Sequence, residues 1–205
     1  MKKLFAAVIL FSLTLAACAA PRDEAQNTAA ETTPVETIAA ETTVSEITVS
    51  ETAGEGKFST FTAYDPDGNE VNGDIFTGYK LTMVNIWGTF CTPCINEMPD
   101  LAKLHKDYAD KEFQIVGLVA DVFSAGKIDE KDARTVKKII DATGADYKHM
   151  LLSKDWNNLI VKNIEGVPTT VFIDEKGNQV GKTVLGSKSY KDWVKIIDKM
   201  LEKVN

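Results

Sequence analysis

The sequence is poor in the residues from which most metal and nucleic-acid sites are built. Its 205 residues include three cysteines and two histidines, and acids outnumber Lys and Arg by 30 to 23. A zinc site takes about four ligands, so few combinations could form one. Residues 57–205 carry a net charge of −2 and show no basic patch, so we expect no bound metal and no nucleic-acid partner.

The sequence also lacks an N-terminal apolar run long enough to cross a bilayer comfortably, which takes about 20 residues. Instead, Lys2 and Lys3 precede a stretch of apolar or small residues, 4–17, as in an export signal. Leu15-Ala16-Ala17-Cys18 resembles a bacterial lipobox, in which the cysteine is diacylated and becomes the mature N-terminus. We expect 1–18 to be a lipoprotein signal peptide and lipidated Cys18 to anchor the protein to the extracytoplasmic side of the bacterial cell membrane. An ordinary signal peptide, cut near Ala19, is the alternative.

Residues 19–56 lack aromatic side chains altogether. Thr, Glu, Ala and Ser dominate, and eight acids against one arginine give a net charge of −7, which equals that of the whole chain. Such a segment cannot bury enough apolar surface to fold, and its like charges extend it. We expect a disordered acidic Thr/Glu-rich tether over 19–56, followed by one domain over 57–205.

Because cysteine is scarce, its count is informative. Three cysteines in an exported chain leave one unpaired, and lipidation of Cys18 would leave Cys91 and Cys94 as a pair. These two flank Thr92-Pro93, between an apolar run at 81–87 and a helical pattern at 91–111. The free N–H groups and the dipole at a helix start favour a thiolate, which is the attacking species in thiol–disulfide exchange. The pattern predicts a redox-active dithiol, with a structural disulfide or half of a zinc site as alternatives.

The remaining patterns predict an α/β domain. Buried-strand patterns lie at 81–87, 113–120, 148–152 and 169–174, and helical patterns at 91–111, 130–143, 154–163 and 189–204. An opening hairpin is expected from 57–64 and 71–76, and a closing one from 169–174 and 179–185. The alternation of strands and helices predicts a mixed, partly parallel sheet with helices on both faces.

Two motifs carry a family resemblance. Trp87-Gly88-Thr89-Phe90-Cys91-Thr92-Pro93-Cys94, followed later by Gly166-Val167-Pro168-Thr169-Thr170, resembles a thioredoxin-like fold. Over about 57–205 the chain resembles more narrowly the extracytoplasmic TlpA/ResA-type thiol–disulfide oxidoreductases, relatives of the AhpC/TSA peroxidases. Four features support the narrower match: Asn85, Glu97, Pro99, and a helix-bearing insertion at about 121–147. Phe90 departs from it, since most members have Trp before the first cysteine.

The resemblance implies a role for each matching residue. Cys91, the more exposed thiol, is the nucleophile, and the buried Cys94 resolves the mixed disulfide. Glu97 lies three residues after Cys94, on the same helix face, and exchanges protons with it; its alternative is a solvated helix residue. Pro168 is expected in cis, presenting the Val167 backbone to substrate by strand addition. Trp87 and Phe90 are expected to form an apolar rim that contacts substrate near the dithiol, and the alternative for Trp87 is a core residue.

The resemblance also implies a function. We expect a membrane-tethered, monomeric reductase of protein disulfides, with no cofactor beyond the Cys91–Cys94 disulfide and with a membrane electron donor of the thiol-transporter type. Substrates in the family include apocytochromes c, sporulation proteins and methionine sulfoxide reductases. The absence of His from Thr92-Pro93 favours the reducing direction.

Two other functions are weighed against this one. Peroxiredoxins need Thr three residues and Pro seven residues before the reactive cysteine, where this chain has Gly88 and Val84. A copper-binding lipoprotein would need a third soft ligand near the cysteines, and none is evident in the sequence.

Overall fold

The computed structural model describes residues 56–204. The predicted signal peptide, lipidated Cys18 and nearly all of the predicted tether lie outside these residues. Within 56–204, no helix is both long and apolar enough to cross a membrane.

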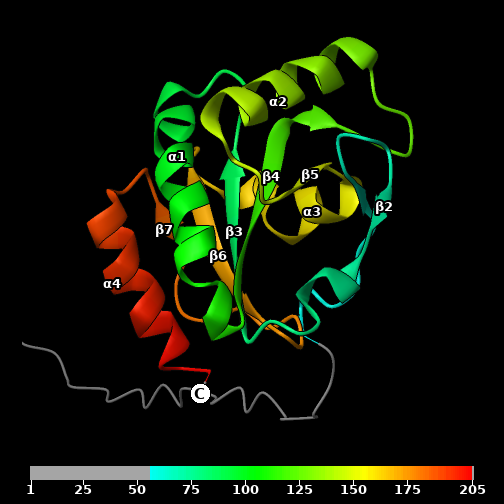
Figure 1. Ribbon diagram of the computed structural model, residues 1–205. Coiled ribbons are helices and arrows are strands. Elements are labelled where there is room, and N and C mark those ends of the chain that lie inside the picture. Colours follow the sequence, from blue (N-terminus) through cyan, green and yellow to red (C-terminus); the bar gives the residue numbers. More distant parts are fainter. Residues whose placement is uncertain (1–55, 205) are drawn as a thin grey trace, which may run out of the picture. The chain divides into compact units, whose positions relative to one another are not determined.

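A five-stranded sheet runs through the domain in the order β5-β4-β3-β6-β7 (Figure 1). Its strands are β3 (Leu81–Trp87), β4 (Phe113–Phe123), β5 (Lys148–Leu152), β6 (Thr169–Asp174) and β7 (Val184–Leu185). β3, β4 and β5 pair in parallel, and β6 runs antiparallel to both β3 and β7. Every residue of the central strand β3 is buried, as its continuous apolar run predicts.

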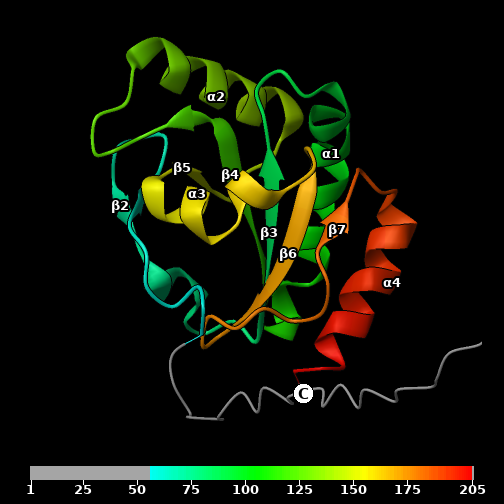
Figure 2. The same ribbon diagram turned by 180° about the vertical axis from the view of Figure 1, so that it is seen from behind.

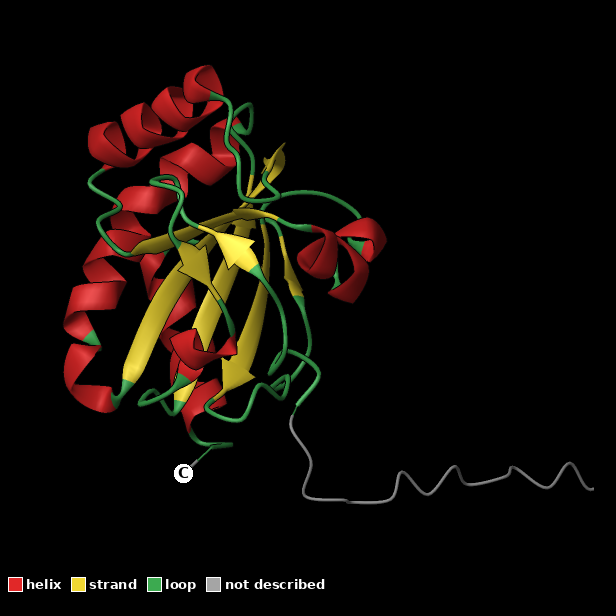
Figure 3. Ribbon diagram, turned by 90° about the vertical axis from the view of Figure 1, so that its right-hand side faces the viewer, coloured by secondary structure: helices red, strands yellow, loops and turns green. Residues whose placement is uncertain are grey.

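Helices cover both faces of the sheet, which confirms the predicted fold class. α1 (Thr92–Asp107), α2 (Glu130–Thr143) and α4 (Tyr190–Leu201) enclose one apolar cluster, which includes Trp87, Met98 and Trp193. α3 (Lys154–Leu159) and the N-terminal segment enclose a second, in which Phe58 and Phe61 pack on Trp156. Figures 2 and 3 show α3 alone on one side of the sheet and the three longer helices on the other.

Helix ends follow the local sequence. Asp129 caps α2 by accepting the N–H groups of Lys131 and Asp132, and Gly144, with φ of 65°, ends it in the left-handed conformation. Ser189 caps α4 by accepting the Asp192 N–H, as in a capping box. Both helices therefore begin where the sequence predicts them to, within a residue.

Two predicted strands are wrong. Residues 73–76 form a 3-10 helix, because the Asn72 side chain accepts the Asp74 N–H and caps a helical turn there. The opening hairpin therefore keeps two residues per strand, β1 (Ala63–Tyr64) and β2 (Glu70–Val71), in a separate small sheet. In the stretch 179–185, Gly181 has φ of 72°, so that stretch pairs with β6 only through β7 and one isolated bridge at Gln179.

The chain enters the domain at Gly56, beside the turn that follows β6. The Gly56 N–H donates to the Lys176 carbonyl (2.8 Å), and a Cβ on Gly56 would lie 2.2 Å from the Gly177 carbonyl carbon. Gly56, the last residue of the predicted tether, is thus packed into the domain. This entry point lies at the end of the sheet where Asp174 pairs with Leu81.

Candidate active site

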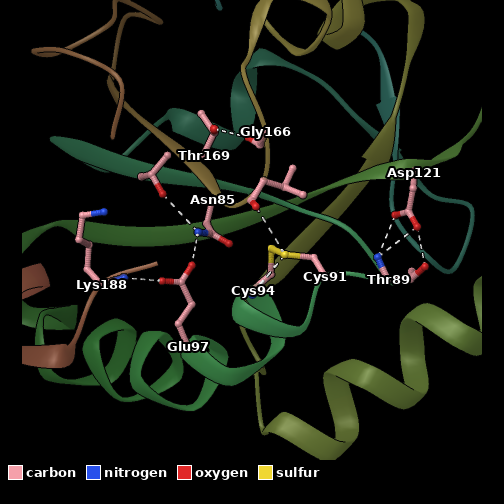
Figure 4. Close-up of a disulfide and its surroundings, with 11 residues drawn as sticks. Asn85, Thr89, Cys91, Cys94, Glu97, Asp121, Gly166, Thr169 and Lys188 are labelled. Carbon is pink, nitrogen blue, oxygen red and sulfur yellow. Dashed lines mark hydrogen bonds between the residues drawn. A yellow bond between two sulfur atoms is a disulfide. The ribbon is translucent and has the colours of Figure 1, made fainter. Parts of the chain in front are cut away.

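Cys91 and Cys94 form a disulfide at the N-terminus of α1, with their Cα atoms 5.3 Å apart (Figure 4). β3 ends at Trp87, a short link follows, and Cys91 is the N-cap residue of the helix. Its sulfur accepts the Cys94 backbone N–H (3.3 Å), and Pro93 lies in the first turn, where a missing N–H costs nothing. A thiolate on Cys91 would receive the same hydrogen bond and the field of the helix.

Both cysteines are buried, but unequally. Cys94 is fully buried and Cys91 is 5% exposed. The prediction that Cys91 is the more exposed of the two is confirmed by a small margin. An incoming sulfur therefore has access to Cys91 first.

The loop before β6 faces this disulfide. The Val167–Pro168 peptide bond is cis, as predicted. The Cys91 sulfur lies 3.7 Å from the Val167 carbonyl oxygen, and the Thr169 hydroxyl donates to the Gly166 carbonyl (2.6 Å). The loop therefore places a backbone carbonyl beside the reactive sulfur, and Figure 4 shows its neighbours Gly166 and Thr169 joined by their hydrogen bond.

The predicted aromatic pair splits into one surface residue and one core residue. Phe90 is 74% exposed beside Cys91. Trp87 is fully buried in the same apolar cluster as both cysteines, with its ring edge-on to His149. The prediction that Trp87 contacts substrate is therefore wrong. As the last residue of a strand buried on both faces, it points under α1.

Asp121 is a site residue that the sequence did not reveal. Its carboxylate accepts the Thr89 N–H (3.0 and 3.1 Å) and the Thr89 hydroxyl (2.5 Å) (Figure 4). Thr89 lies two residues before Cys91, so this contact fixes the link between β3 and the nucleophile. β4 runs on to Phe123, so Asp121 lies on a strand, one residue past the strand predicted at 113–120.

Glu97 is buried within a set of hydrogen-bond donors. It is 5% exposed, and its carboxylate accepts the Asn85 amide (3.1 Å), the Lys188 backbone N–H (3.0 Å) and the Trp193 indole N–H (3.3 Å). Burial raises the pKa of Glu97 above its ordinary value, and these hydrogen bonds oppose the shift in part. The alternative of a solvated helix residue is excluded.

Asn85 lies between Glu97 and the disulfide in Figure 4. Its amide nitrogen donates both to Glu97 and to the Thr170 hydroxyl (3.2 Å). No direct hydrogen bond joins Glu97 to Cys94 in the disulfide form among the contacts of the described residues.

The two histidines are structural rather than reactive. His149 is buried, its Nε2 bonds the Ala145 carbonyl (3.0 Å), and burial lowers its pKa to about 4. It lies over Gly117, where a Cβ would come within 2.2 Å of its Nδ1. His105 accepts the Ile115 N–H (3.1 Å), and burial lowers its pKa too. Among the hydrogen bonds of the described residues, neither histidine is joined to the disulfide.

The arrangement supports two-electron sulfur chemistry. It combines a disulfide at a helix N-terminus, an exposed aromatic beside it, backbone groups opposite, and a buried carboxyl behind. In the part of the chain that the structure describes, no group of three or more His, Cys, Asp or Glu side chains is placed to hold a metal ion.

Comparison with known proteins agrees with this chemistry. Residues 52–201 match the family model described as Redoxin. The chain is 37% identical over 98 residues to the thioredoxin-like protein YneN of Bacillus subtilis, which covers 48% of this chain and 52% of that protein. It is 30% identical over 101 residues to the thiol-disulfide oxidoreductase ResA of Halalkalibacterium halodurans, covering 49% and 52%. The matches thus span about half the length of these relatives.

Solved structures show the same fold. A thiol:disulfide interchange protein of the thioredoxin family from Chlorobium tepidum TLS aligns with a TM-score of 0.57 and 25% identity, covering 72% of this chain and 96% of that one. A thiol:disulfide interchange protein from Bacteroides sp. aligns with a TM-score of 0.54 and 26% identity, covering 71% and 90%. Both likenesses extend over most of the described domain.

Proposed function

Because this chain belongs to the Redoxin family and is a thioredoxin-like protein of the TlpA/ResA type, we propose that it is a thiol–disulfide oxidoreductase that reduces protein disulfides outside the cytoplasm. The observation that carries the proposal is the Cys91–Cys94 disulfide at the start of α1, facing the loop of Val167 and Pro168. ResA, named a thiol-disulfide oxidoreductase, is among its relatives.

The reaction takes two steps. The Cys91 thiolate attacks one sulfur of a substrate disulfide, forms a mixed disulfide and releases the other substrate sulfur as a thiolate. Cys94 then loses its proton and attacks Cys91, which re-forms the Cys91–Cys94 bond and releases the second substrate thiolate. Two electrons pass to the substrate, and its two thiolates take up two protons from solvent.

The neighbouring residues support these steps. The Cys94 N–H and the helix dipole stabilise the Cys91 thiolate. The exposed ring of Phe90 offers apolar contact to substrate, and the Val167 backbone offers strand-like pairing. Glu97, whose pKa burial raises, is suited to take up and return the proton of Cys94 at near-neutral pH, with Asn85 between them.

The same proposal covers the rest of the chain and the partners. Cys18 carries a lipid anchor, residues 19–55 hold the domain off the membrane, and a membrane thiol transporter re-reduces the disulfide. The protein acts as a monomer, without nucleic acid or a bound cofactor. Apocytochromes c, sporulation proteins and methionine sulfoxide reductases are the candidate substrates.

Reduction of insulin by the full chain in detergent, with dithiothreitol as electron source, tests the activity. Cys91→Ser should abolish the rate above background. Cys94→Ala should instead accumulate mixed disulfides through Cys91, and mass spectrometry of the trapped species identifies the substrates. Equal insulin reduction by wild type and Cys91→Ser would refute the proposal, and so would faster consumption of peroxide than of disulfides.

A separate experiment tests the anchor. Cells expressing the chain are fed a labelled fatty acid, and incorporation and membrane association are followed for wild type and Cys18→Ser. Loss of both in Cys18→Ser is expected. Label retained by Cys18→Ser would show that the lipid is attached elsewhere.

A further inference from the structure

The amide oxygen of Asn85 is buried without a hydrogen-bond partner. Asn85 is fully buried, its Nδ2 donates to Glu97 and Thr170, and its Oδ1 accepts no hydrogen bond from any described residue. An unpaired buried acceptor costs about 1–3 kcal/mol. Beside a reactive disulfide, this cost can differ between the oxidised and the reduced protein. The unpaired oxygen of Asn85 therefore requires an explanation.

The oxygen faces the disulfide. Figure 4 shows the Asn85 amide turned so that its nitrogen meets Glu97 while its oxygen is directed toward Cys94. Cys94 and Glu97 lie three residues apart on α1, so they share the face of the helix under which the Asn85 side chain is packed. A sulfur in a disulfide has no hydrogen to donate, and a thiol has one.

We propose that Asn85 sets the balance between the disulfide and dithiol forms, because its Oδ1 accepts the S–H of Cys94 only after reduction. This inference rests on the proposed redox function of the same cysteines. Reduction adds two electrons and two protons, breaks the sulfur–sulfur bond and leaves a thiol on each cysteine. The Cys94 thiol then donates a hydrogen bond to Asn85 Oδ1, which accepts none in the disulfide form. Asn85 therefore stabilises the dithiol relative to the disulfide.

Asn85 is a positioning residue in this scheme, since it acts through Cys94 and does not contact substrate. The other polar groups around it are already committed: Glu97 accepts from its nitrogen, from Lys188 and from Trp193, and Thr170 accepts from the same nitrogen. Among the described residues, the other buried side-chain oxygen without a hydrogen-bond partner is the hydroxyl of Tyr147, whose ring stacks on His149.

The test is the equilibrium of the full chain with reduced and oxidised glutathione at pH 7. Asn85→Leu, which keeps the shape but removes the acceptor, should lower the dithiol-to-disulfide ratio about tenfold, or about 30 mV in reduction potential. Asn85→Ala should shift the ratio in the same direction and serves if the leucine variant does not fold. An unchanged ratio, or a higher one, overturns the proposal.

Two further variants separate the oxygen from the nitrogen of Asn85. Thr170→Val removes a partner of the nitrogen only, and should leave the ratio within about twofold of wild type. In a Glu97→Gln background, Asn85→Leu should still lower the ratio, since the effect does not pass through the carboxylate. A shift equally large in Thr170→Val, or one lost with Glu97→Gln, would refute the assignment to the oxygen.

The glutathione equilibrium needs no protein substrate. The role of Asn85 and the proposed reductase function can therefore be refuted independently of each other. Normal insulin reduction with no effect of Asn85→Leu on the equilibrium would refute the role of Asn85 alone. The predicted shift without any insulin reduction would support the role of Asn85 and refute the proposed reductase activity.

Discussion

Replacing Asp121 should weaken the link that positions the nucleophile. Its carboxylate receives two donors, the N–H and the hydroxyl of Thr89, two residues before Cys91. Hydrogen bonds to a charged group contribute about 1.5–3 kcal/mol each when buried. Asp121 is exposed, so we expect Asp121→Ala to cost about 1–2 kcal/mol in total, or about 2–8 °C in Tm for a domain of this size.

The catalytic effect of Asp121→Ala follows from the same contact. If the link must be ordered when Cys91 attacks, the loss of 1–2 kcal/mol lowers kcat/KM for a disulfide peptide by about 5–30-fold. Urea unfolding and peptide reduction are measured together. Asp121→Asn retains one acceptor oxygen and should lose less of both.

A double-mutant cycle with Thr89→Val isolates the hydroxyl part of the contact, since valine keeps the backbone N–H and removes only the hydroxyl donor. The two substitutions together should cost less than the sum of their separate costs. Additive effects, or reduced stability with full activity, would contradict the positioning role of Asp121.

Three other outcomes are expected. Because burial raises the pKa of Glu97, the contribution of this carboxyl to the free energy of unfolding is fully present below the ordinary Glu pKa and is lost as pH rises through the folded-state pKa. In urea unfolding, wild type should therefore lose stability relative to Glu97→Gln from about pH 4 upward. A difference between the two proteins that does not change with pH would count against this. Gly117→Ala places a Cβ within 2.2 Å of the His149 ring and should lower the free energy of unfolding by about 1–3 kcal/mol. Gly166→Ala, with no atom within 4 Å of its added Cβ, should change it by less than about 0.5 kcal/mol. Equal losses of stability in the two variants would rule out the steric explanation. Phe90→Ser should leave stability within about 0.5 kcal/mol, because the ring is 74% exposed, but should raise KM for an apolar disulfide peptide up to about tenfold; an equal rise for oxidised glutathione would argue against apolar contact.

The reactive pair and its setting could be predicted because their signals are local. Cys91 and Cys94 lie at a strand-to-helix junction that periodicity reveals, and the residues before Thr169 mark the facing loop. β5 and β6 have the predicted bounds because short apolar runs flanked by polar residues leave little choice of register. The position of Glu97 on the face of Cys94 follows from helix geometry alone.

The rest of the site depends on contacts between distant residues. Asp121 and Thr89 are 32 positions apart, and an acid just past a predicted strand gives no sign that it has a partner. The core position of Trp87 escapes prediction for a related reason. All seven positions of β3 are buried, so no alternation shows which side chains face α1 and which face α3.

The orphaned oxygen of Asn85 also required the structure. It depends on the register that sets Asn85 opposite Thr170 and Gly117 on the neighbouring strands, and on the turn of one amide. The residue type can be read from the sequence, but which of the two polar atoms of the amide has a hydrogen-bond partner cannot.

The entry of the chain at Gly56 has a mechanical consequence. Gly56 is hydrogen-bonded to the turn after β6, at the end of the sheet where β3 begins, whereas Cys91 follows the other end of β3, which is seven residues long. At about 3.3 Å per residue, the two ends of β3 are separated by roughly 20 Å. A pull applied through residue 56 would load the far end of the sheet and leave the sulfur-bearing edge unloaded. A domain held from its N-terminal side would thus keep the end of the sheet that carries Cys91 and Cys94 accessible to a substrate disulfide.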